Sequence, residues 1–133
     1  FKAMDTLSGH GLVTGVLLDP VLPYLTDSED NIRRIVQKAK YHGAHYIYAS
    51  MAVTMEGIQR EHFYAELERF APGVADLYKK KYKASYRCRV PHLDKLWHAF
   101  ADECEKHHII YDMRAVNQRI RAGYDISELH IGQ

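Results

Sequence analysis

Cysteine is scarce in this sequence, which has 2 thiols in 133 residues, Cys88 and Cys104. Two thiols cannot build a disulfide framework, and their scarcity favours a reduced, cytoplasmic setting. No apolar run approaches the ~20 residues that a membrane span needs, and no signal-peptide pattern opens the sequence, so we expect no membrane partner. Neither sign of charge is in excess, because the formal net charge is +1 at pH 7. Any contact with nucleic acid must therefore come from a local patch.

An apolar run over residues 12–18 is the first strong signal of secondary structure. Apart from Thr14 and Gly15 the run is continuously apolar, which predicts a short strand buried on both faces, as in a parallel sheet. Pro20 and Pro23 end this strand, because proline lacks the amide donor that a sheet needs. Two interpretations of residues 19–27 stay open: a ligand-binding loop held rigid by its prolines, or a merely stiff connection.

Residues 26–51 complete a strand–helix–strand unit. Thr26, Asp27 and Ser28 are all residue types that cap helix N-termini, and Thr26 and Glu29 match a capping box. Gly43 is placed to end that helix. Residues 44–51 are rich in β-forming side chains and predict a second strand. Two strands joined by a helix in this way must pair in parallel. The apolar residues of the helix recur at helical spacing and are Ile32, Ile35, Val36 and Ala39.

The second half of the chain is predicted to be mostly helical. Helices are expected over residues 59–70, 74–81 and 93–104. The last of these has the clearest apolar stripe, which includes Trp97 and Cys104. A third strand is expected over residues 109–113, and one or two helical turns over residues 116–122.

Several motifs resemble the late catalytic barrel of radical S-adenosylmethionine (SAM) enzymes, in the group of spore photoproduct lyases and DNA repair photolyases. They are "GLVTGVLL" (11–18), "PVLP" (20–23), "NI" (31–32) and "GAHYIY" (43–48). The similarity continues through "QREHFYAELERFAPGVADLYKKKY" and "YRC" to about residue 113. The resemblance implies an α/β fold in one compact domain. Residues 1–55 would be the C-terminal portion of a partial TIM-type (β/α) barrel, with parallel strands and helices, and residues 56–133 a helical C-terminal extension with one short strand.

The resemblance also implies two cofactors in the complete enzyme, SAM and a [4Fe-4S] cluster. The family holds the cluster with three cysteines in a C-x-x-x-C-x-x-C motif, which this sequence lacks. We therefore expect the chain to be the C-terminal fragment of a longer, lyase-like enzyme. Its partner would be the N-terminal half that carries the cluster, and the fragment alone would be inactive and bind no cofactor.

The family's SAM contacts come from the ends of its late barrel strands. Carried over by position, they imply SAM-binding roles for Asp19, Pro20, Tyr48 and Ser50. The acidic residue of the family's loop corresponds to Asp27. A role as the N-cap of the following helix would explain an aspartate at this position equally well.

The most basic stretch, residues 78–89, supports a different hypothesis: a stand-alone α/β module that binds single-stranded nucleic acid, DNA included, or a protein partner. Cationic side chains bind phosphates, and tyrosine rings stack on bases. The more ordinary alternative is a packing edge of tyrosines beside a solvated face of lysines. The candidate nucleic-acid contacts are Lys79, Lys80, Lys81, Tyr82, Lys83 and Arg87.

Neither a metal site nor hydrolytic catalysis is predicted. The pair His42 and His45, and the group of Cys104 with His107 and His108, each lack the four converging ligands of a zinc site. No phosphate-binding loop, G-x-S-x-G or H-E-x-x-H motif occurs. Because a partial barrel leaves an unpaired strand edge, we expect this chain to form a homo-oligomer.

Overall fold

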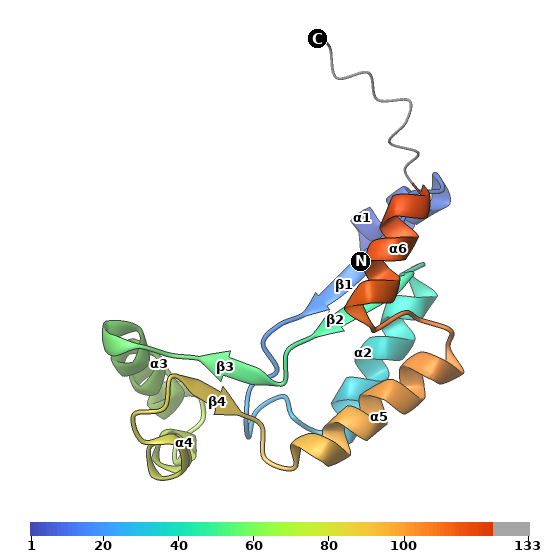
Figure 1. Ribbon diagram of the computed structural model, residues 1–133. Coiled ribbons are helices and arrows are strands. Elements are labelled where there is room, and N and C mark those ends of the chain that lie inside the picture. Colours follow the sequence, from blue (N-terminus) through green and yellow to red (C-terminus); the bar gives the residue numbers. More distant parts are fainter. Residues whose placement is uncertain (124–133) are drawn as a thin grey trace.

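The computed structural model describes residues 1–123, so the end of the predicted extension, residues 124–133, lies outside the described part. The chain is built from helices and short strands, as labelled in Figure 1. No helix of this part is both long and apolar enough to span a bilayer. In chain order the elements are α1 (Lys2–Gly9), β1 (Gly15–Leu18), α2 (Glu29–Tyr41), β2 (Tyr46–Ala49), β3 (Ala52–Thr54), α3 (Gly57–Phe70), α4 (Val74–Tyr82), β4 (Arg87–Arg89), α5 (Leu93–Lys106) and α6 (Met113–Gly123).

The predicted strand–helix–strand unit is confirmed. β1 and β2 pair in parallel, with Gly15 opposite Tyr46 and Leu18 opposite Ala49, and α2 connects them. A side chain at Gly15 would collide with the ring of Tyr46. The glycine inside this strand therefore makes room for an aromatic neighbour on the pairing strand.

The ends of α2 follow from its sequence, with one correction. The N-cap is Ser28, whose hydroxyl accepts a hydrogen bond from the Asn31 N–H at 3.2 Å. The predicted capping box at Thr26 is wrong, because the Thr26 hydroxyl accepts from the Leu22 N–H at 2.8 Å and so holds the preceding loop. At the other end, Gly43 has a φ of +79°, the left-handed conformation expected after a helix.

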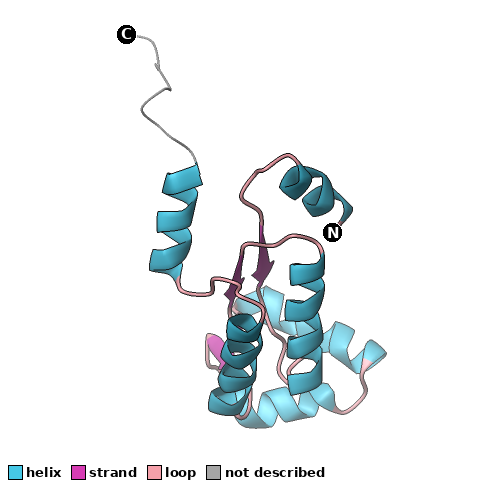
Figure 2. Ribbon diagram, turned by 90° about the vertical axis from the view of Figure 1, so that its right-hand side faces the viewer, coloured by secondary structure: helices cyan, strands magenta, loops and turns pink. Residues whose placement is uncertain are grey.

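Helices α2 and α5 lie side by side and cover one face of the β1–β2 pair (Figures 1 and 2). Burying each large apolar side chain there contributes ~1.5–3 kcal/mol. Strand residues alternate between faces, so Ile47 is buried while its neighbour Tyr48 is 37% exposed. Leu17 of β1 pairs with Tyr48 and is 74% exposed. The helical residues of this first core are Ile32, Val36, Ala39, Leu96, Phe100 and Cys104.

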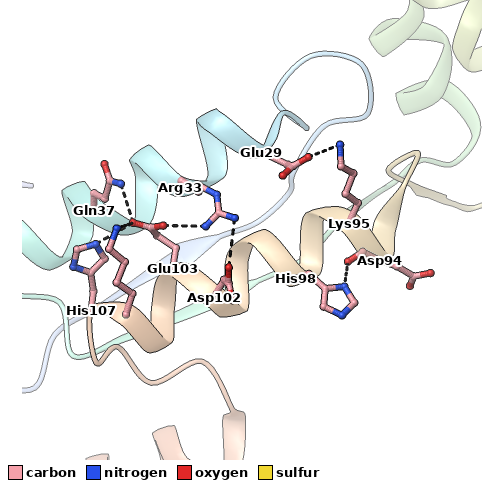
Figure 3. Close-up of polar contacts among 10 residues, drawn as sticks. Glu29, Arg33, Gln37, Asp94, Lys95, His98, Asp102, Glu103 and His107 are labelled. Carbon is pink, nitrogen blue, oxygen red and sulfur yellow. Dashed lines mark hydrogen bonds and ion pairs between the residues drawn. The ribbon is translucent and has the colours of Figure 1, made fainter.

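A buried carboxylate joins the two helices. Glu103 of α5 has a side chain that is 3% exposed and accepts hydrogen bonds from Arg33 and Gln37 of α2 at 3.0 and 2.8 Å. The ring of His107 lies 3.0 Å from the same carboxylate, and Figure 3 shows these groups converging on it. The bond from Gln37, followed by those from Arg33 and His107, lowers the pKa of Glu103 to about 2. The group is therefore ionised at neutral pH and holds α2 against α5.

Beyond β2 the chain forms a second, smaller sheet with its own core. β3 and β4 pair antiparallel, with Val53 opposite Cys88, and the two helices between them in sequence, α3 and α4, pack against this sheet. Arg60 of α3 donates to the carbonyls of Met55 and Ser85 at 2.8 and 2.7 Å, which fixes the entry to β4. The buried residues of this second core are Met55, Leu67, Ala75, Tyr78, Tyr82 and Cys88.

The predicted partial barrel is wrong. A (β/α) barrel continues with parallel strands that are each followed by a helix. Here β2 is followed, after Ser50 and Met51, by an antiparallel strand, and the described residues form two small sheets. The third parallel strand is reduced to a bridge between Ile110 and Tyr46, while α6 covers the last predicted helical turns. Residues 1–123 thus form a mixed α/β fold in which helices predominate.

Candidate ligand-binding site

Ser50 is the junction at which the two sheets meet. Its N–H donates to the Leu18 carbonyl at 3.0 Å, and its own carbonyl accepts from the Val21 N–H at 2.9 Å. Its hydroxyl donates to the Ala52 carbonyl at 3.3 Å. The end of β2, the exit of β1 and the start of β3 are therefore held together at one residue.

The loop after β1, residues 19–27, is held to the rest of the fold by two hydrogen bonds, one beside Pro20 and one at Pro23. Besides the bond from Val21 to Ser50, Tyr78 of α4 donates from its buried hydroxyl to the Pro23 carbonyl at 2.9 Å. Burial raises the pKa of Tyr78, so the hydroxyl keeps its proton at every ordinary pH. Tyr24 has a φ of 61° and packs edge-on against the Tyr78 ring at 5.9 Å between centroids. This packing holds a backbone conformation that is costly for a non-glycine residue.

One cleft opens where β1 ends, against β3 and β4, and we call it the Asp19 cleft. Its volume is about 490 Å³. A carboxylate, a guanidinium, hydroxyls and an amide give it both donors and acceptors, which suits a polar ligand with groups of both charges. Its lining includes Asp19, Pro20, Ser50, Thr54, Gln59 and Arg87.

A second cleft, which Ser50 also lines, opens between the end of β2, β4 and the start of α5, and we call it the Trp97 cleft. Its volume is about 450 Å³. Trp97, which is 40% exposed, and Tyr48 offer ring surface, and two arginines make one wall positive. The two clefts share Ser50 and Arg87. The lining includes Tyr48, Ser50, Arg87, Arg89, Trp97 and His98.

The four residues that the resemblance implies for SAM lie around these adjoining clefts. Asp19 and Pro20 line the Asp19 cleft, Tyr48 lines the Trp97 cleft, and Ser50 lines both. Their convergence follows from the parallel pairing, because the carboxyl ends of parallel strands meet at one edge of the sheet.

The candidate nucleic-acid residues are divided between surface and core. Tyr82 is buried in the second core and its hydroxyl donates to the Arg89 carbonyl, so its ring cannot stack on a base. Tyr78 is buried as well. These two tyrosines therefore form a packing edge, as the more ordinary alternative predicts. The cationic residues are exposed, on α4 or just after it and on β4: Lys79, Lys80, Lys81, Lys83 and Arg87.

Neither cysteine lines either cleft. Cys104 is buried in the first core and Cys88 in the second. Burial raises the pKa of both thiols, that of Cys104 to about 12, so both stay protonated and unreactive at neutral pH. Across residues 1–123, no group of three or more His, Cys, Asp or Glu side chains is arranged to hold a metal ion.

Several cleft residues are absent from the sites predicted from sequence, Arg89 and Trp97 among them. The position of Trp97 in the apolar stripe of α5 predicts a buried side chain, but Trp97 is partly exposed whereas its neighbour Leu96 is buried. Its ring packs against Phe100 at 5.4 Å between centroids, and the remaining surface lines the cleft. The sequence pattern of Arg87, Cys88 and Arg89 could have indicated that Arg89 lies beside Arg87. It is typical of a strand in which the apolar residue points inward and both arginines point outward.

Comparison with known proteins finds no match to this chain. No family model fits the sequence, no curated protein is similar to it, and no solved structure resembles it.

Proposed function

We propose that this chain is the C-terminal part of a cytoplasmic radical SAM enzyme similar to the spore photoproduct lyases and DNA repair photolyases, and that it is not catalytic alone. The order of motifs over residues 11–48 supports this assignment. One structural observation carries it: Asp19, Pro20, Tyr48 and Ser50, all implied for SAM by the resemblance, surround two adjoining clefts. A barrel within residues 1–123 is not required.

The side chains of the clefts fit the chemistry of SAM. The Asp19 carboxylate is suited to accept from the SAM ammonium or ribose hydroxyls, and the Ser50 hydroxyl to bond a polar edge of the ligand. The Tyr48 ring is suited to lie against the adenine. In this enzyme class SAM is the source of the adenosyl group from which the reaction starts.

The residues of this chain do not fit a [4Fe-4S] cluster. Such a cluster in this family needs three thiolates, whereas the sequence has 2 cysteines. These are buried in two different cores, with pKa values raised by burial. In our proposal the cluster therefore belongs to an N-terminal part of the same enzyme.

The intact protein encoded by the complete gene tests the assignment. A C-x-x-x-C-x-x-C motif must lie within roughly two hundred residues upstream, the length typical of the class. The protein purified anaerobically must hold about four iron atoms per chain, with the visible absorption of a cluster. A gene without the motif, or a protein without iron, would show that the assignment is wrong.

Substitutions in the same intact protein test the SAM site. Asp19→Asn should weaken SAM binding about tenfold, because it removes a charged acceptor. Asp76→Asn, on the exposed side of α4, is the matched control and should leave binding unchanged. Equal affinity for both variants would remove Asp19 from the site.

Self-association of the isolated chain is part of the proposal. Within residues 1–123, β1 pairs only with β2, so its other edge has no strand partner. Leu17 on this strand is 74% exposed. Free apolar strand edges pair with further copies, so light scattering should detect a dimer or larger assembly that Leu17→Lys converts to monomer. A monomeric wild-type chain at high concentration would contradict this expectation.

A second candidate function is binding of single-stranded nucleic acid or a protein partner by the chain itself. The observation that favours it is the exposed cationic surface of α4, where Lys80 and Lys81 have no ion pair within residues 1–123. Fluorescence anisotropy of a labelled oligonucleotide should then report affinity that falls steeply as salt rises. Absence of binding at low salt would dismiss this candidate.

A further inference from the structure

We infer that the Trp97 cleft, which adjoins the Asp19 cleft and shares Ser50 and Arg87 with it, binds a small aromatic oxyanion, a ligand that joins a planar ring to a phosphate or carboxylate group. The residues that define this site are Arg87, Arg89 and Trp97. Tyr48 and Ser50, which the resemblance implies for SAM, also line this cleft. The three defining residues are not among those implied for SAM, so the inference does not rest on the radical SAM assignment.

The arginines form the anion-binding wall of the cleft. Cys88 between them is buried, so both guanidinium groups project from the same side of β4. Within residues 1–123 neither group has a hydrogen bond or an ion pair, and both line the cleft. The lining includes one acid, Asp94, so the wall carries an excess of positive charge. Adjacent guanidinium groups without partners match the several acceptor oxygens of a phosphate or carboxylate.

Trp97 of α5 adds aromatic surface to the lining of the cleft. It is 40% exposed, yet its ring is held by contact with the fully buried Phe100 at 5.4 Å between centroids. An indole held in this way presents a fixed apolar surface for a planar ring. A ligand ring on Trp97 and an oxyanion on the arginines would use both surfaces at once.

His98 adds a polar group to the lining of the cleft. Its Nδ1 lies 2.6 Å from the Asp94 carbonyl, and Figure 3 shows this bond. A carbonyl only accepts, so Nδ1 is the donor of this bond and Nε2 is the ring nitrogen left for a ligand. A hydroxyl group on the ligand is suited to bond with it.

The size of the cleft selects a small molecule. Its volume of about 450 Å³ lies within the ~300–1,000 Å³ range of small-molecule sites. A ring with one attached oxyanion fits this volume, whereas a folded protein partner would contact only its rim.

The fluorescence of Trp97 tests the site directly, because the sequence has 1 tryptophan. The chain is titrated with phenyl phosphate, phenol and inorganic phosphate. Phenyl phosphate should give a saturable change in emission with an affinity at least about tenfold higher than either half-ligand, because only it engages both surfaces. Benzoate, the carboxylate analogue, should compete with it.

Variants of the arginine wall complete the experiment. Arg89→Gln should weaken phenyl phosphate about tenfold or more, and Arg89→Lys should recover part of the affinity because it keeps the charge. Arg119→Gln makes the same replacement at an exposed position of α6 outside the cleft and should have no effect. Circular dichroism verifies that each variant is folded. Equal binding of inorganic and phenyl phosphate, no saturation at millimolar concentrations, or equal effects of Arg89→Gln and Arg119→Gln would each overturn the inference.

Discussion

Replacing Glu103 by glutamine should loosen the contact between α2 and α5 and destabilise the whole chain. The Glu103 side chain is 3% exposed and accepts from Gln37, Arg33 and His107 at 2.8, 3.0 and 3.0 Å. A glutamine retains the shape of the side chain but removes its charge. Its NH2 group replaces one carboxylate oxygen and cannot accept the hydrogen bonds that this oxygen accepted. The Arg33 guanidinium then lies beside a neutral group in a partly buried place.

The size of the effect follows from the pKa of Glu103. That pKa falls from 4.5 to about 2 on folding, and one pKa unit corresponds to about 1.4 kcal/mol. Allowing for solvent screening at the partly exposed Arg33, the ionised carboxylate contributes about 2–3 kcal/mol. This contribution is fully present above pH 4.5 and is lost as the pH falls toward 2, because the folded state holds the proton less tightly than the unfolded state.

Urea unfolding followed by circular dichroism measures this contribution. Glu103→Gln should lower the free energy of unfolding by about 2–3 kcal/mol at pH 7, and the difference from wild type should shrink as the pH falls below 4.5 toward 2. Glu68→Gln, on the exposed side of α3, is the matched control and should change stability by less than about 0.5 kcal/mol. A difference of the same size at pH 7 and pH 3, or no difference at either, would refute the electrostatic explanation.

Three further expectations concern single side chains. Ser28→Ala removes the N-cap of α2 and should lower the free energy of unfolding by about 1 kcal/mol. Ser28→Asn keeps a capping side chain and should retain the stability of the wild type. An unchanged stability in Ser28→Ala would count against the cap. Tyr78→Phe leaves the Pro23 carbonyl without its donor and should cost about 1–3 kcal/mol, which urea unfolding would detect or exclude. Cys104 should resist iodoacetamide at pH 8 until the chain unfolds, because burial raises its pKa to about 12; rapid alkylation of the folded chain would show otherwise.

The elements of the first core could be predicted from sequence because their signals are local. The apolar run before Pro20 and the helical spacing of Ile32 and Val36 predict β1 and α2, and Gly43 marks the helix end. The stripe through Leu96 and Phe100 likewise predicts α5. Each of these patterns lies within a few turns or one strand, so no long-range contact is needed to read it.

The second sheet could not be predicted in this way. β3 and β4 have three residues each and are separated by α3 and α4, so neither shows a pattern long enough to identify it. The barrel prediction failed for a related reason: a strand–helix–strand unit occurs in many folds, and only the pairing of Val53 with Cys88 reveals that the chain leaves the parallel sheet.

The candidate site was predictable only in part. The position of Asp19 and Ser50 at strand ends placed them near one another, because parallel strands end at the same edge. Arg89 and Trp97 could not be assigned, since their meeting depends on how β4 and α5 pack beside β2.

Amide chemical-shift mapping of the chain titrated with phenyl phosphate is the most direct test of a ligand site at the junction of the two sheets. We expect saturable shifts at Ser50, Arg87, Arg89 and Trp97, and none at Lys80 on α4. Shifts confined to α3 and α4, or no saturable shift at Ser50 and Trp97, would contradict it.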